Sequence, residues 1–265
     1  MDTAAEHTSP DGPRIDPLLA DRVTEALLLA GLPVGYGGHG PGVHLLPARP
    51  YDDSDDCAGR IALHWEPGPR LAAAAAMEQP RQPASAARRT VDSTMRNALA
   101  EFLPAFGIEV EAGPLGGETR VGRAATPAPA PGRDAATPAP AGARPEDLGI
   151  GADVVAAVRR TALLAGLPVA DHLHAPGITL TPCRPVDDGD DTAGLADLRW
   201  NPSRRLSAAT DERAARARTA VQDAMRHAFG TVLGACGLDL QWRRPTTIPY
   251  QLRAYGLTAR PPVRR

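Results

Sequence analysis

The sequence contains no lysine, so all 29 of its basic residues are arginine. A phosphate-binding G-x-x-x-x-G-K-[ST] loop and a Schiff-base lysine both require an amine, and the composition excludes both. The simplest cause is the coding bias of a GC-rich gene. Whatever its cause, the absence removes amine chemistry from the functions open to this chain.

Cysteine is also scarce. The three cysteines, Cys57, Cys183 and Cys236, are far apart and form no C-x-x-C pair, so we expect neither a disulfide framework nor a cysteine-rich zinc site. A reducing, cytoplasmic location fits this usage best. The sequence has no run of 18 apolar residues, and residues 1–14 lack the apolar core of a signal peptide. We therefore expect no membrane span and no secretory signal.

An internal repeat is the strongest feature of the sequence. Residues 31–71 align without a gap with residues 166–206, and 22 of the 41 aligned positions are identical. After a deletion of five residues, Met95-Arg96 recurs as Met225-Arg226. Two such units predict a pair of related domains rather than a solenoid.

Composition divides the chain into five parts. The repeated units span 16–111 and 145–242, after an N-terminal segment, 1–15, that we expect to be disordered. Residues 112–144 between the units are rich in Ala, Pro and Gly, which favours an extended, disordered linker because alternating proline cannot build a core. Residues 243–265 form an arginine-rich tail.

Hydrophobic periodicity predicts the order α-β-β-α-β in each unit. Asp16-Pro17 is a helix start, and Gly31 ends that helix. Two strands follow, then a helix with apolar residues at helical spacing, and then a short last strand. We expect this last strand to lie parallel to the second, in a position that could flank the first. The predicted fold class is therefore α+β, a tandem duplication of a small two-layer unit joined by the Ala/Pro linker.

Acidic loops at matching positions are the most chemically suggestive motif. They contain Asp52, Asp53, Asp55 and Asp56 in the first unit and Asp187, Asp188, Asp190 and Asp191 in the second. Clustered carboxylates could bind Ca²⁺ or Mg²⁺, but the spacing does not complete a twelve-residue calcium loop. A solvated hairpin tip and a partner-binding acidic patch are the alternatives.

Other motifs argue against catalysis. Gly35-x-Gly37-x-x-Gly40 follows a helix and leads into a strand, whereas a dinucleotide site needs the reverse order. His39 and His174 correspond between the units but have no third ligand at metal spacing. No serine or cysteine is paired with a histidine at matched positions, so we expect no catalytic residues and no cofactor.

The C-terminal tail carries the opposite charge from the two units. The units have net charges of −5 and −3, and the tail has +6. Its arginines are Arg243, Arg244, Arg253, Arg260, Arg264 and Arg265. With interleaved aromatic residues the tail could bind nucleic acid, or it could dock on an acidic protein surface, or it could have no specific role.

The sequence thus predicts a non-catalytic interaction or regulatory protein, an internal pseudo-dimer of two acidic units with an unknown protein partner. A nucleic-acid-binding protein that uses the tail, and a divalent-metal-dependent enzyme that uses the acidic loops, are the alternatives.

Overall fold

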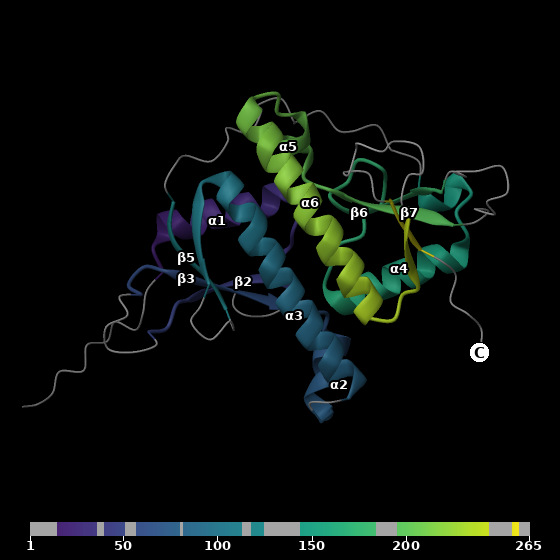
Figure 1. Ribbon diagram of the computed structural model, residues 1–265, viewed down its shortest axis with the longest axis horizontal. Helices are drawn as coiled ribbons and strands as arrows, with labels where there is room; N and C mark the ends of the chain where they lie inside the picture. Colours follow the sequence, from purple (N-terminus) through teal and green to yellow (C-terminus); the bar gives the residue numbers. More distant parts are fainter. Residues whose placement is uncertain are drawn as a thin grey trace, which may run out of the picture.

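The computed structural model describes residues 15–35, 40–50, 57–79, 82–112, 118–124, 144–183, 195–243 and 256–259. Its α+β architecture contains two mixed or antiparallel sheets and six α-helices within these ranges. We call residues 15–124 the first half and residues 144–259 the second half. The two sheets lie on either side of a central pair of helices (Figure 1).

The first helix of each half is built as the sequence predicts. Helix α1 (Pro17–Leu29) begins where the Asp16 carboxylate accepts a hydrogen bond of 2.9 Å from the Leu18 amide, with Pro17 in the first turn. Helix α4 (Ala152–Ala165) ends at Gly166, whose φ of 78° is left-handed and favours glycine. Both helices bury an apolar stripe and therefore contribute to the core.

The first sheet has the strand order β1-β2-β3-β5-β4. Its strands are β1 (Val34–Gly35), β2 (Gly42–Pro47), β3 (Ile61–Glu66), β4 (Ile108–Ala112) and β5 (Thr119–Ala124). Strands β2 and β3 are antiparallel, with Val43 opposite Trp65 and His44 opposite His64. The side chain of Trp65 is 3% exposed while its neighbour His64 is exposed, so alternation places one face of β3 in the core.

The second sheet has the order β6-β7-β9-β8, with all neighbours antiparallel. Its strands are β6 (Gly177–Pro182), β7 (Ala196–Asn201), β8 (Leu240–Arg243) and β9 (Gly256–Ala259). Ile178 lies opposite Trp200, so β6 and β7 present the same kind of pairing as β2 and β3.

Two strands correct the predicted boundaries. Strand β5 lies inside the segment 112–144 that we expected to be a linker, and β9 lies inside the expected tail, 243–265. Both were missed because they are short and their apolar pattern is interrupted. In β5 the buried Val121 stands beside Arg120, which is also buried and whose guanidinium pairs with Glu118 and the Arg49 carbonyl. The two folded halves therefore extend beyond 111 and 242.

The predicted element order also needs correction. Each half has an additional short helix before its long one, α2 (Pro69–Met77) and α5 (Arg204–Ala208). Strand β4 lies at the sheet edge beside β5 and not beside the first strand, because β5 inserts between β3 and β4. The prediction that the last strand flanks the first is wrong.

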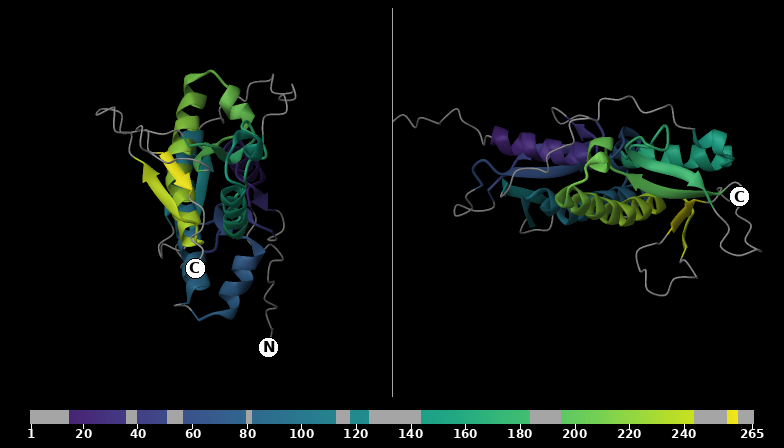
Figure 2. Two further views of the ribbon diagram at one scale, coloured as in Figure 1. Left: turned by 90° about the vertical axis from the view of Figure 1, so that its right-hand side faces the viewer. Right: turned by 90° about the horizontal axis from the view of Figure 1, so that it is seen from above.

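Helices α3 (Pro83–Phe102) and α6 (Glu212–Ala235) pack against each other in the centre of the molecule, with α1 and α4 behind them (Figures 1 and 2). Two short 3-10 helices complete the described structure, Leu103–Phe106 and Pro145–Leu148. The buried side chains of both halves, among them Val91, Met95, Val221 and Met225, belong to a single hydrophobic cluster. The halves therefore share one core.

Candidate functional site

The halves meet at two tryptophans, each of which binds the end of a helix in the other half. The Trp65 indole Nε1 donates a hydrogen bond of 2.9 Å to the Ala165 carbonyl at the end of α4. The Trp200 indole donates one of 2.8 Å to the Ala30 carbonyl, which follows α1. Corresponding partners differ by 135 positions in both cases. Carbonyls at helix ends lack partners within the helix, so these two bonds satisfy groups that would otherwise be buried unpaired.

Backbone contacts beside the tryptophans follow the same reciprocal pattern. The Gly68 amide donates to the Leu164 carbonyl, and the Ser203 amide donates to the Leu29 carbonyl, both at 2.9 Å. A Cβ on Gly166 would lie 3.0 Å from the Glu66 carbonyl oxygen of the opposite half. The backbone segments of the two halves approach so closely here that each half fixes the helix end of the other.

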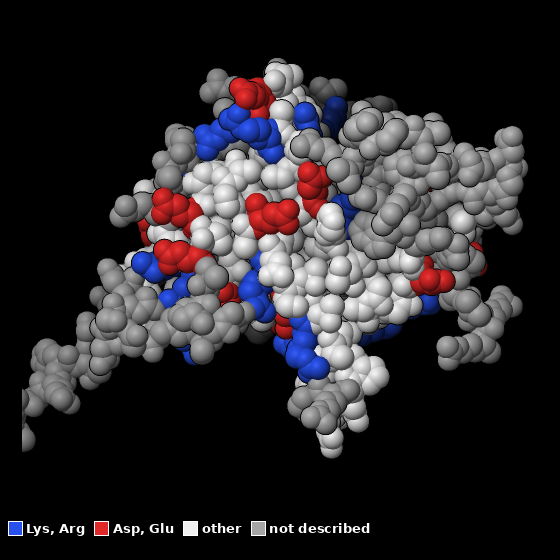
Figure 3. All heavy atoms as spheres, in the orientation of Figure 1, with Lys and Arg blue, Asp and Glu red and all other residues white. Residues whose placement is uncertain are grey.

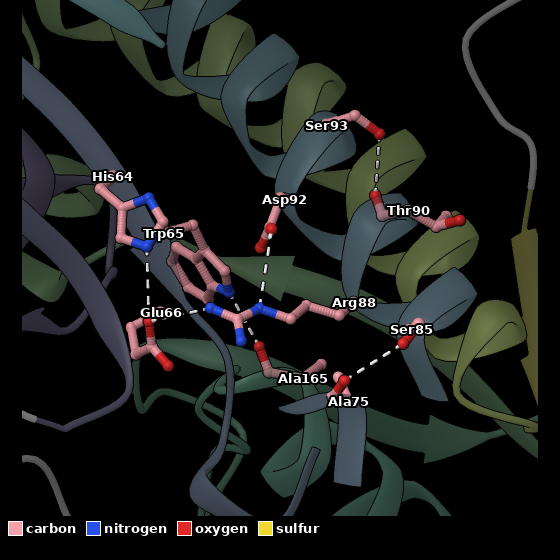
Figure 4. A network of polar contacts seen from close by, with 10 residues as sticks. All are labelled: His64, Trp65, Glu66, Ala75, Ser85, Arg88, Thr90, Asp92, Ser93 and Ala165. Atoms are coloured by element: carbon pink, nitrogen blue, oxygen red, sulfur yellow. Dashed lines mark hydrogen bonds and ion pairs between the residues drawn. The ribbon is translucent and has the colours of Figure 1, made fainter. Parts of the chain in front are cut away.

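A polar cluster lies between β3 and α3, and we call it the β3–α3 cluster (Figure 4). It consists of His64 and Glu66 on β3 and Arg88 and Asp92 on α3. The Glu66 carboxylate lies 3.4 Å from His64 Nε2 and 3.7 Å from an Arg88 nitrogen. The Arg88 guanidinium also lies 4.0 Å from the Asp92 carboxylate, one helical turn away. Two carboxylates and two cationic or titratable groups thus share one site.

Asp92 is a partly buried member of the cluster. Burial raises the pKa of its carboxyl above the ordinary value, and the Arg88 guanidinium and His64 oppose that shift. One carboxylate oxygen, Oδ1, is buried and has no hydrogen-bond partner among the described residues. An unsatisfied buried oxygen is costly, so the deprotonated form of Asp92 is disfavoured in the fold.

The β3–α3 cluster has no equivalent in the second half. The aligned positions are occupied by Arg199, Asn201, Arg218 and Gln222. Asn201 instead donates to the Leu173 carbonyl at 2.7 Å, and Arg218 donates to the Ser207 carbonyl at 2.9 Å. The two halves therefore share a core but present different polar surfaces.

Chemically, the β3–α3 cluster is suited to recognition. The His64 ring is 46% exposed and Glu66 is 27% exposed, so both can reach a partner in solution. No hydroxyl or thiol nucleophile is hydrogen-bonded to His64 among the described residues. The exposed imidazole, carboxylate and guanidinium can instead bind complementary polar groups.

We expect Asp92→Asn to change the pH dependence of stability. Because the folded pKa of Asp92 is raised, the folded chain binds this proton more tightly than the unfolded chain does. Wild-type stability should therefore fall as the pH rises from the ordinary pKa through the raised one, and the variant should lose that fall. At neutral pH the variant should be at least as stable, since Gln222 already places an amide at the aligned position. Urea unfolding from pH 3 to 8 measures this, and a difference that is independent of pH would contradict it.

Most of the residues singled out by the sequence lie outside the described residues. This holds for the eight aspartates of the acidic loops, for His39, and for Arg244, Arg253, Arg260, Arg264 and Arg265 of the tail. Arg243 is the last residue of β8, and its side chain is not described. Their predicted roles remain predictions.

The remaining candidates can be placed. The His174 amide donates to His172 Nδ1 at 3.3 Å, which makes this pair part of a loop turn. Among the described residues, no group of three or more His, Cys, Asp or Glu side chains could hold a metal ion. None of the three cysteines forms a disulfide, and burial raises the pKa of the Cys236 thiol to about 11, so this thiol is a poor nucleophile at neutral pH.

The residues of the β3–α3 cluster were not recognised from the sequence. The pattern places His64 and Glu66 on the outer face of a strand, and Arg88 and Asp92 four residues apart on a helix. The sequence pattern does not show that this strand and this helix contact each other. One signal was available: the second unit replaces both β3 residues and Asp92, although the surrounding core positions are retained.

In the described part of the chain, no helix has both the length and the apolar character needed to cross a membrane. Comparison with known proteins finds no matching family model, no matching curated protein and no matching solved structure.

Proposed function

We propose that the chain is a non-catalytic interaction or regulatory protein, built as an internal pseudo-dimer of two acidic α+β units. The observation that carries this proposal is the reciprocal pair of tryptophan bonds, Trp65 to Ala165 and Trp200 to Ala30. In an isologous interface, residue i of one unit contacts residue j of the other, and j contacts i. The reciprocal bonds follow that rule within one chain.

Strand pairing gives further support to the two-unit origin. Val34 pairs in parallel with Val43, and Val169 pairs in parallel with Ile178, at the same sequence offset. Helices α3 and α6, which contain aligned residues of the two units, also pack against each other. The units differ from the predicted two-layer α-β-β-α-β unit by the additional helix and strand in each half.

In a pseudo-dimer of this kind, the surface residues of one unit can change while the core residues of both units are retained. The β3–α3 cluster occurs in the first half alone, so a partner can distinguish the two faces. On the face in Figure 3, charged residues form small separate groups with broad uncharged surface between them. Such a surface suits a protein partner better than nucleic acid, which requires a continuous basic stripe.

The two alternative functions, nucleic-acid binding and metal-dependent catalysis, rest on the arginine-rich tail and the acidic loops, which lie mostly outside the described residues. One consequence for testing the nucleic-acid alternative is that β9 lies inside the arginine-rich segment. Removing 243–265 would delete a strand as well as charge. Substitution of the tail arginines is therefore the cleaner test.

The proposal is tested by affinity capture from an extract of the source organism with the full chain and two variants. Arg88→Gln removes a member of the β3–α3 cluster, and Arg218→Gln changes the aligned arginine of the second half. We expect recovery of at least one protein partner to fall about tenfold with Arg88→Gln, a typical effect for a contact worth roughly 1.4 kcal/mol. Recovery should stay at the wild-type level with Arg218→Gln. Equal capture by wild type and both variants would contradict a partner site at this cluster.

A further inference from the structure

A shallow hollow lies where α2 of the first half meets α4 of the second. It has a volume of about 100 Å³ and is lined by Pro69, Arg70, Arg160, Leu163 and Leu164. Gly68 brings the two helices together, because its amide bonds the Leu164 carbonyl and a Cβ there would lie 1.9 Å from the Leu163 oxygen. The floor is apolar, and Leu163 is 60% exposed.

Two arginines border this apolar hollow. Arg70 is the second residue of α2 and Arg160 lies in the second-last turn of α4, and both side chains are exposed. Within the described part of the chain, neither guanidinium has an ion pair or hydrogen bond with another side chain. Two like charges beside one apolar surface repel each other unless an anion lies between them.

The equivalent junction between the halves, where α5 of the second half meets α1 of the first, contains that negative charge. Arg205 is aligned with Arg70, and its guanidinium lies 3.4 Å from the Glu25 carboxylate on α1. Glu25 is aligned with Arg160. Leu28, which is 51% exposed, is aligned with Leu163. One junction between the halves therefore pairs an arginine with a carboxylate of the same chain, and the other junction has a second arginine in place of that carboxylate, beside an open hollow.

We propose that this hollow binds a small carboxylate with a short apolar body, whose carboxylate lies between Arg70 and Arg160 as Glu25 lies beside Arg205. An engineered cavity of about 150 Å³ holds benzene, so a hollow of this size suits about three to five carbon atoms. Because the lining is almost entirely apolar apart from the guanidiniums, the hollow favours an amphipathic anion over a bare inorganic one. The ligand would contact both halves, and this site does not depend on the proposed partner-binding role.

The test is an NMR titration of the full chain, with 3-methylbutanoate as the probe. We expect saturable shifts of the Arg70 and Arg160 side-chain resonances and of the Leu163 and Leu164 methyl groups. A Kd of about 1 mM is expected for a ligand of this size. The neutral amide 3-methylbutanamide and inorganic phosphate should each bind at least about tenfold more weakly, because each lacks one of the two interactions.

Three variants complete the test. Arg160→Glu recreates the Glu25–Arg205 arrangement and should weaken binding at least tenfold while the protein remains folded, as judged by its melting temperature. Arg70→Gln should also weaken binding, whereas the matched change Arg205→Gln should leave the Kd unchanged. The proposal is overturned if the amide binds as tightly as the carboxylate, if phosphate does so, if Arg160→Glu retains wild-type affinity in a folded protein, or if the shifts map elsewhere.

Discussion

Replacing Trp200 with alanine is expected to lower the free energy of unfolding by about 3–5 kcal/mol, the usual cost of truncating a buried large aromatic residue. The Trp200 ring is 3% exposed and stacks on Phe229, with ring centroids 6.5 Å apart. Its indole N–H also satisfies the Ala30 carbonyl of the opposite half. The substitution therefore removes packing within one half and a hydrogen bond between the halves.

Trp65→Ala should have an effect of similar size, because Trp65 is equally buried and makes the reciprocal bond to Ala165. Phenylalanine at either position keeps most of the ring but leaves a helix-end carbonyl unpaired, which costs about 1–3 kcal/mol. Chemical denaturation followed by circular dichroism measures these changes. Leu18→Ala on the exposed surface of α1, where Leu18 is 75% exposed, is the control and should change stability by less than about 0.5 kcal/mol. A loss below 1 kcal/mol for Trp200→Ala would contradict the reciprocal interface.

The local elements of this fold could be predicted because their signals are local. Asp16-Pro17 specifies a helix start through one side chain and one fixed backbone angle, and the structure confirms it. The strands before and after each acidic loop were predicted from alternation, and β2 and β3 are the antiparallel pair that a hairpin requires. Each of these signals lies within a few residues of the chain.

The elements that could not be predicted depend on distant partners. Strand β5 becomes a strand because β3 and β4 bond to it on both sides. Its own sequence, with Gly122 between arginines, has weak strand propensity. Arg120 would be read as a solvent-exposed residue, yet the Arg49 carbonyl and Glu118 allow it to be buried. Tertiary contacts overrode the local pattern here.

The candidate sites were hidden for the same reason. His64 and Asp92 are 28 positions apart, and only the packing of α3 on β3 makes them neighbours. The hollow between α2 and α4 requires both halves, since Arg70 and Arg160 come from different ones. Comparing aligned positions of the two halves identifies both sites, because each is a place where the shared pattern is replaced by a different charge.

The most direct test of the proposed pseudo-dimer is to cut the chain between its halves and ask whether they stay together. A protease site is inserted in the segment 125–143, which connects β5 to the second half. The purified chain is then cleaved under native conditions. Because the halves share one hydrophobic core and two reciprocal tryptophan bonds, we expect the fragments to remain associated at micromolar concentration. Native mass spectrometry should then give a single species with the mass of the whole chain. The same cut in a Trp65→Ala/Trp200→Ala variant should release separate fragments. Two independent fragments from the wild-type chain would contradict the account.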